Sequence, residues 1–151
     1  MKLSDNISAF HHYAIKAQDF QVTLNFYREL GFALIHDWSL PEYNLERGGM
    51  LYNSKINSYI EIFDKNAEIP TQGRKRNKEE EFIENSILHI CFVVKDAEKA
   101  RISAINAGAK DLSEGVLTID LSNKSKNLNV RNSIVYSPNG EVIEFLERVV
   151  F

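Results

Sequence analysis

The stretch HYAIKAQDFQVTLNFYRELG (12–31) is matched later in the chain by HICFVVKDAEKARISAINAG (89–108), and this repetition decides the fold. In both stretches an aspartate lies seven positions after the opening histidine, and a glycine lies twelve positions after the aspartate. The pattern H-x6-D-x11-G thus occurs twice, 77 positions apart. A repeat of this kind predicts two copies of one structural unit.

Each copy of the repeat opens with a strand-like run and continues into a helix. Asp19 and Asp96 stand where a helix needs a side-chain acceptor for its first unpaired N–H groups. Gly31 and Gly108 suit the left-handed position at which many helices end. The apolar residues with helical spacing are Val22, Phe26 and Leu30 in the first copy and Ala97, Ala100, Ala104 and Ile105 in the second. Strand-like runs cover residues 10–16, 32–38, 47–53 and 58–63, and then 87–94, 109–112, 116–121, 132–137 and 141–147.

This order of elements predicts an α+β fold in which a βαβββ module is written twice. We expect module one at residues 8–63 and module two at residues 87–148, both within a single domain that spans residues 1–151. Residues 64–86 are rich in charge and contain chain-breaking proline and glycine, so they are interpreted as a solvated linker.

Composition limits the classes of partner. The formal net charge of −3 and the pI near 5.8 offer no basic field to attract nucleic acid or an anionic membrane. No stretch approaches the length of an apolar membrane span, and the polar N-terminus does not resemble a secretory signal. The single cysteine excludes an internal disulfide and favours a reducing compartment. We therefore expect a cytoplasmic protein that acts on a small molecule.

Two histidines and two glutamates occupy equivalent places in the two copies. His12 and His89 lie in the first strand-like runs, and Glu61 and Glu144 lie in the last ones. Taken one at a time, each is more typical of an ordinary strand residue than of a ligand. As a set related by pseudo-twofold symmetry, two imidazoles and two carboxylates suit a borderline divalent ion such as nickel, zinc, cobalt, iron or manganese.

The repeat also chooses between the adjacent histidines of "FHHYAI" (10–15). His12 has a twin in His89, whereas the residue before His89 is a leucine. His11 is expected to face the helix side of the strand and to tolerate replacement. Cys91 is interpreted as a small buried hydrophobic residue, with a thiol close to the ligands as the alternative.

The sequence resembles the vicinal oxygen chelate superfamily, which includes glyoxalase I, bleomycin resistance proteins and extradiol dioxygenases. The resemblance rests on HHYAIKAQDFQVTLNFYRELGF (11–32), SYIEIF (58–63), LHICFVVKDAEKARISAINAGAK (88–110) and SPNGEVIEFLE (137–147). It implies paired βαβββ modules that form a cupped mixed sheet around a metal. His12, Glu61, His89 and Glu144 match the family's ligand positions, and glutamate at position 61 makes this set most similar to glyoxalase I.

The resemblance implies a metal-dependent lyase or isomerase that moves a proton on an α-hydroxycarbonyl of hemithioacetal type through an enediolate. Glu144 would be the principal base, and Glu61 its partner in returning the proton. Nickel or zinc is the expected ion, with cobalt, manganese or iron as alternatives. Two other readings of the same scaffold are a non-catalytic ligand-sequestering protein of bleomycin-resistance type and an epimerase or dioxygenase acting on another substrate.

Two positions depart from the glutathione-binding pattern of bacterial glyoxalase I. Arginine and asparagine are usual there, whereas this chain has Lys16 and Lys65. Lysine provides a point charge without the bidentate geometry of arginine, so a different anionic or α-hydroxycarbonyl substrate is the alternative to a glutathione adduct. The resemblance further implies a homodimer, in which a site can draw its ligands from one chain or from two.

Overall fold

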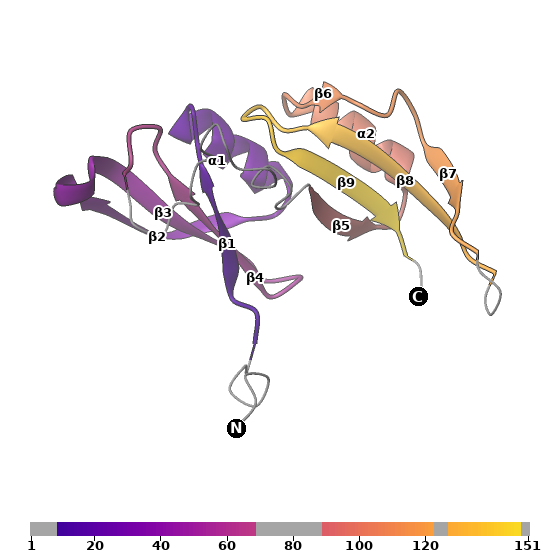
Figure 1. Ribbon diagram of the computed structural model, residues 1–151, viewed down its shortest axis with the longest axis horizontal. Helices are drawn as coiled ribbons and strands as arrows, with labels where there is room; N and C mark the ends of the chain where they lie inside the picture. The colour runs from indigo at the N-terminus through magenta and orange to yellow at the C-terminus, as the bar shows by residue number, and fades with distance from the viewer. Residues whose placement is uncertain (1–8, 69–88, 123–126, 149–151) are drawn as a thin grey trace, which may run out of the picture. The chain divides into compact units, whose positions relative to one another are not determined.

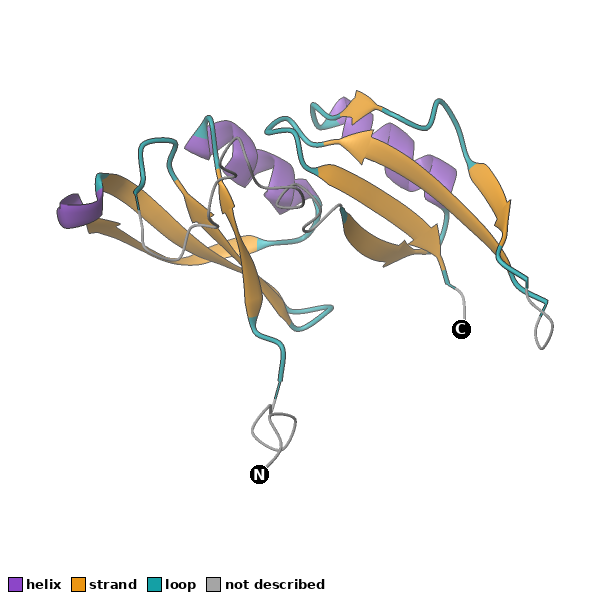
Figure 2. Ribbon diagram, viewed as in Figure 1, coloured by secondary structure: helices purple, strands orange, loops and turns teal. Residues whose placement is uncertain are grey.

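The chain folds into two compact units, Met1–Pro70 and Thr71–Phe151, in a computed structural model that describes residues 9–68, 89–122 and 127–148 (Figure 1). Each unit has one α-helix beside one layer of strands (Figure 2). The predicted α+β fold class is therefore confirmed. Of the predicted linker 64–86, only residues 64–68 are described, and the rest lies outside the described residues.

The first unit contains a four-stranded mixed sheet. Its elements are β1 (His12–Lys16), α1 (Phe20–Glu29), β2 (Ala33–Leu40), the short 3-10 helix η2 (Pro41–Tyr43), β3 (Leu45–Asn53) and β4 (Ser58–Phe63). The strand order is β1-β4-β3-β2. β1 pairs with β4 in parallel, and the other pairs are antiparallel. The first and last strands of the repeat therefore lie side by side.

The second unit repeats this arrangement. Its elements are β5 (Ile90–Val94), α2 (Ala97–Asn106), β6 (Lys110–Asp111), β7 (Leu117–Asp120), β8 (Asn129–Tyr136) and β9 (Val142–Glu147). β5 pairs with β9 in parallel, and β8 pairs with β9 antiparallel, in the order β5-β9-β8-β6. One difference is that β6 and β7 both pair with β8, where the first unit has the continuous strand β2.

Ser113 explains the break between β6 and β7. Its hydroxyl accepts a hydrogen bond from the Ile134 N–H at 2.9 Å and donates one to the Gly115 carbonyl at 2.7 Å. A side chain thus satisfies a backbone group that a continuous strand would have paired. Glu114 has a positive φ of 55°, which turns the chain away from the sheet before β7 begins.

The helix ends agree with the sequence prediction. Asp19 accepts a hydrogen bond from the Val22 N–H at 2.9 Å, and Asp96 accepts one from the Lys99 N–H at 3.0 Å. Gly31 and Gly108 follow the two helices with φ of 88° and 104°, a region that residues with a side chain rarely adopt. Both aspartates are therefore N-caps, and both glycines end their helices as expected.

The apolar face of α1 differs from the predicted one. Val22 is 47% exposed, whereas Leu24, Phe26 and Tyr27 are buried. The predicted apolar stripe begins at Val22, which lies in the first turn of the helix, and this side chain points to solvent. The buried apolar residues of this unit also include Ile60 of β4, Phe32, Leu51 and Ile62, while Leu45 packs in a cluster with Phe63 and Ala67.

Side-chain alternation gives each sheet a covered face and an open one. In the first unit Ile60 and Ile62 face the side that α1 covers, and Glu61 faces the other side. In the second unit Ile143 and Phe145 are buried on the side of α2, and Glu144 between them faces away.

Among the described residues, no helix is both long enough and apolar enough to cross a membrane.

Candidate metal centre

The first unit brings His12 and Glu61 together. Ala14 is the β1 residue paired with Glu61, and His12 lies two positions earlier on the same face of the sheet. His12 Nε2 is 3.3 Å from Glu61 Oε2, and the two side chains are 34% and 18% exposed. A partly exposed imidazole and a more enclosed carboxylate thus share the open face.

The second unit repeats this pair. Cys91 is the β5 residue paired with Glu144, and His89 lies two positions before it, next to the start of β5. His89 Nε2 is 3.1 Å from Glu144 Oε2, and the side chains are 46% and 17% exposed. Each copy of the repeat therefore places its predicted histidine and glutamate in contact.

The spacing of each pair fits two ligands of one metal ion. Ligand atoms that are each about 2.1 Å from an ion lie about 3.0 Å apart at a right angle and about 3.4 Å apart at the tetrahedral angle. The separations of 3.3 and 3.1 Å fall within this range. Imidazole nitrogen with carboxylate oxygen is a donor set that zinc and other first-row divalent ions accept.

Each unit contributes one histidine and one glutamate to the set of four predicted ligands. Over residues 9–68, 89–122 and 127–148, no three His, Cys, Asp or Glu side chains are grouped closely enough to hold an ion. The four predicted ligands are thus described as two pairs, one in each unit.

The two glutamates have different neighbours, which the sequence analysis missed. The side-chain amide of Asn132 donates a hydrogen bond to Glu144 Oε1, and Asn132 is only 4% exposed. In the first unit, the register places Gly48 at the position equivalent to Asn132. A Cβ at Gly48 would lie 2.7 Å from the Trp38 ring, so that position has no room for a donor side chain. The register of β8 against β9 brings Asn132 to Glu144, and no sequence pattern indicates that register.

Cys91 also acts on Glu144. The residue is exposed overall, which contradicts the prediction of a buried hydrophobic side chain. Local desolvation, the charge of Glu144 and a hydrogen bond to that carboxylate raise the pKa of the thiol to about 11. The thiol therefore stays protonated at neutral pH and is a donor to Glu144. The equivalent residue in β1 is Ala14.

His11 does not lie where the sequence analysis placed it. It precedes β1, is exposed, and stacks on Tyr59 with ring centroids 4.5 Å apart and planes 5° apart. Tyr59 is paired with His12, so this stack lies on the face that carries the histidine–glutamate pair and not on the helix side. Strand alternation failed for His11 because the strand begins one residue later.

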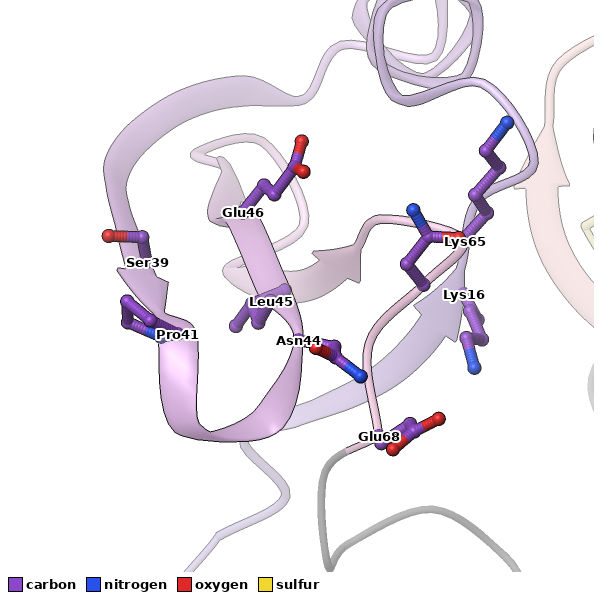
Figure 3. A pocket seen from close by; sticks show the side chains of 9 residues that line it. Lys16, Ser39, Pro41, Asn44, Leu45, Glu46, Lys65 and Glu68 are labelled. Atoms are coloured by element: carbon purple, nitrogen blue, oxygen red, sulfur yellow. The ribbon is translucent and has the colours of Figure 1, made fainter.

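A pocket of about 820 Å³ in the first unit is lined by both lysines that depart from the glutathione-binding pattern. Lys16 is the last residue of β1, and Lys65 follows β4. Figure 3 shows the two lysines and Glu68 on one side of the pocket and Ser39 on the other. The lining combines cationic, anionic and amide side chains, so the pocket suits a polar, charged group rather than an apolar one.

The described fold consists of two units, each with one α-helix and a mixed sheet whose open face carries one histidine and one glutamate. The profile of the Glyoxalase/Bleomycin resistance protein/Dioxygenase superfamily matches residues 9–145. The chain belongs to this superfamily. No curated relative matches its sequence.

Solved structures of similar fold include glyoxalases and a fosfomycin resistance protein. A glyoxalase family protein from Enterococcus faecalis has a TM-score of 0.66 and 24% identity, and the match covers 92% of this chain and 97% of that one. The trypanothione-dependent glyoxalase I of Leishmania major has a TM-score of 0.58 and 17% identity, with 93% and 87% covered. The fosfomycin resistance protein FosX of Listeria monocytogenes, complexed with Mn(II) and sulfate, has a TM-score of 0.57 and 14% identity, with 95% of each chain covered. At these identities the likeness concerns the fold.

Proposed function

We propose that this protein is a metal-dependent lyase or isomerase of glyoxalase I type, in which His12, Glu61, His89 and Glu144 hold one divalent ion. The observation that supports this proposal is the recurrence of a histidine–glutamate contact at ligand spacing in both units. A ligand-sequestering protein needs no such recurrence. Nickel or zinc suits the two imidazoles and two carboxylates, and cobalt, manganese and iron suit them next best.

In the proposed reaction the two glutamates handle the proton. An ion held by His12, Glu61, His89 and Glu144 would supply Lewis-acid stabilisation of the negative charge that develops on substrate oxygens. The carboxylate of Glu144 would accept a proton from the carbon that bears the hydroxyl group. That proton would then pass to the neighbouring carbon, with Glu61 as the partner of Glu144 in its return, so that both glutamates end as the carboxylates they were at the start. The hydrogen bond from Asn132 keeps Glu144 Oε1 in a fixed position during this transfer.

The pocket beside Lys16 and Lys65 is proposed to bind a charged end of the substrate. Lysine side chains attract carboxylate or phosphate groups as point charges. The hemithioacetal of an anionic thiol is the substrate class that combines such an end with an α-hydroxycarbonyl. We further propose that the protein works as a homodimer in the cytoplasm.

The decisive experiment is metal analysis of protein purified without chelator, followed by a methylglyoxal and thiol isomerisation assay after reconstitution with nickel, zinc or manganese. We expect about one ion per four-residue set and metal-dependent turnover. Protein that neither carries nor takes up metal would exclude the lyase and favour sequestration. Bound metal without isomerisation of any hemithioacetal would keep the metal site and exclude the proposed reaction.

Glu144→Gln separates the two functions assigned to that residue. The amide keeps an oxygen that can ligate but cannot accept the proton, so we expect turnover to fall much further than metal content. Equal loss of both would remove Glu144 from the role of base. His12→Ala is the matched control, because it should reduce metal content directly.

A further inference from the structure

We infer that His11 is a positioning residue for His12, and that its ring, stacked on Tyr59, holds His12 with Nε2 directed at Glu61. This inference rests on the proposed metal site for its functional meaning. It reverses the sequence-based expectation that His11 tolerates replacement.

The contact between the two histidines is specific. His11 Nδ1 lies 2.8 Å from His12 Nδ1, a hydrogen-bond distance that requires one ring to donate and the other to accept. The rings are nearly perpendicular, with centroids 5.0 Å apart and planes at 85°. The nitrogen of His12 that is left over, Nε2, is the atom that faces Glu61 at 3.3 Å.

A metal-binding histidine needs one ring nitrogen for the ion and the other for a hydrogen bond, and the two nitrogens of His12 are arranged in this way. The ring nitrogen opposite to the metal normally makes a hydrogen bond that fixes the ring's orientation and tautomer. When Nε2 of His12 is a ligand, its Nδ1 carries the proton and donates to His11. The usual partner in such a bond is a carboxylate, a carbonyl or a water, and here it is a second imidazole.

His11 is exposed, so its own position needs support, and an aromatic stack provides it. The His11 ring lies parallel to Tyr59 at 4.5 Å, and Tyr52 contacts the Tyr59 ring at 4.6 Å. The Tyr52 hydroxyl donates to Asn57 at 3.0 Å, which anchors the far end of the stack. Two rings, from β3 and β4, therefore restrain His11. The second module has Leu88 at the equivalent position, so His89 cannot have a matching histidine partner.

The variants separate stacking from hydrogen bonding. His11→Phe keeps a ring over Tyr59 and removes the nitrogen. His11→Asn removes the stack and places an acceptor oxygen close to where Nδ1 was. Tyr59→Leu weakens the support and leaves both imidazoles, and Tyr59→Phe is the matched control that preserves the ring. Wild-type secondary structure by circular dichroism is required of each variant before it is compared.

The first measurement uses the metal-free protein. We expect ¹⁵N NMR to detect a scalar coupling across the hydrogen bond between His11 and His12, absent in His11→Phe and retained in Tyr59→Phe. Because no metal is present, this result stands independently of the proposed function. A wild-type spectrum without the coupling, in which the His12 nitrogen shifts do not respond to His11→Phe, would overturn the pairing.

The second measurement is zinc affinity by competition with a chromophoric chelator. We expect His11→Phe to bind zinc about 10-fold to 100-fold more weakly than wild type, and His11→Asn to recover part of that loss. Wild-type affinity in His11→Phe, in protein whose zinc binding is abolished by His12→Ala, would overturn the positioning role and leave the metal site intact. Wild type that binds none of zinc, nickel, cobalt, manganese and iron would overturn the proposed function and, with it, the role of His11 toward a metal.

Discussion

The carboxylate of Glu144 accepts a hydrogen bond from the side-chain amide of Asn132, a residue buried within β8. The equivalent position in the first module is Gly48, where the Trp38 ring occupies the space of a side chain. The two halves of the repeat therefore share their histidine and glutamate but hold the glutamates differently. Glu144 is fixed by donors, whereas the positions equivalent to those donors beside Glu61 are a glycine and an alanine.

Replacing Asn132 with alanine should weaken metal binding by about 10-fold, because outer hydrogen-bond partners orient the ligands that they contact. The free energy of unfolding should also fall by about 1–3 kcal/mol, since a hydrogen bond to a charged group is lost. Chelator competition and urea denaturation measure the two effects. Asn129→Ala, an exposed asparagine on the same strand, is the control and should change neither. Unchanged metal affinity in Asn132→Ala would show that Glu144 needs no such support.

Mixing two inactive variants should reveal whether sites are shared between subunits. If each site takes one pair from each chain of a homodimer, a dimer of His12→Ala with His89→Ala contains one intact site and one doubly damaged site. After dissociation and reassociation of an equal mixture, we expect turnover to return to about one quarter of wild type, because random pairing makes about half of the dimers mixed. Turnover that stays at the level of the single variants would place each site within one chain.

The two pocket lysines should govern affinity for anionic substrates. We expect Lys16→Gln and Lys65→Gln each to raise KM for the hemithioacetal of an anionic thiol, with little effect on kcat, because they remove attraction to a remote charge. The effect should shrink at high ionic strength, as screening predicts. The matched comparison is the hemithioacetal of a neutral thiol, whose KM should stay constant. A rise in KM for both substrates alike would exclude charge recognition.

Asp96 should make stability depend on pH. Hydrogen bonds from the backbone and then the side chain of Lys99 hold the pKa of Asp96 below its ordinary value. A carboxyl group with a lowered pKa in the folded state stabilises the fold above its ordinary pKa of about 3.9, and this contribution is lost as pH falls through the lowered value. Thermal melts from pH 6 to pH 2 should show the loss. Asp96→Asn keeps an acceptor at the N-cap but cannot titrate, so its melting temperature should vary less; an identical pH profile would contradict the assignment.

Local features of the fold could be predicted because short-range chemistry determines them. Asp19 and Asp96 cap helices whatever surrounds them, and Gly31 and Gly108 end those helices because few other residues adopt a positive φ. The same applies to the existence of the strands, which follows from their residue types and from the turn residues between them.

Features that depend on register or packing could not be predicted. The predicted orientation of His11 was wrong because β1 starts at His12. No local sequence signal marks that boundary. The burial of α1 was misjudged at Val22 because the sheet, and not the helix, decides which stripe is covered. Asn132 reaches Glu144 only in the register of β8 against β9, and Lys16 and Lys65 share a pocket because parallel β1 and β4 end together.

The unequal surroundings of the two glutamates also make the repeat a convenient starting point for redesign. Ala14 and Cys91 occupy matching positions, differ by a single sulfur atom, and lie outside the set of four proposed ligands. Exchanging the two residues by Ala14→Cys and Cys91→Ala would move the thiol donor from one carboxylate to the other without altering a ligand. The hydrogen-bond donor beside each glutamate can thus be exchanged separately, which a repeat of two identical halves would not allow.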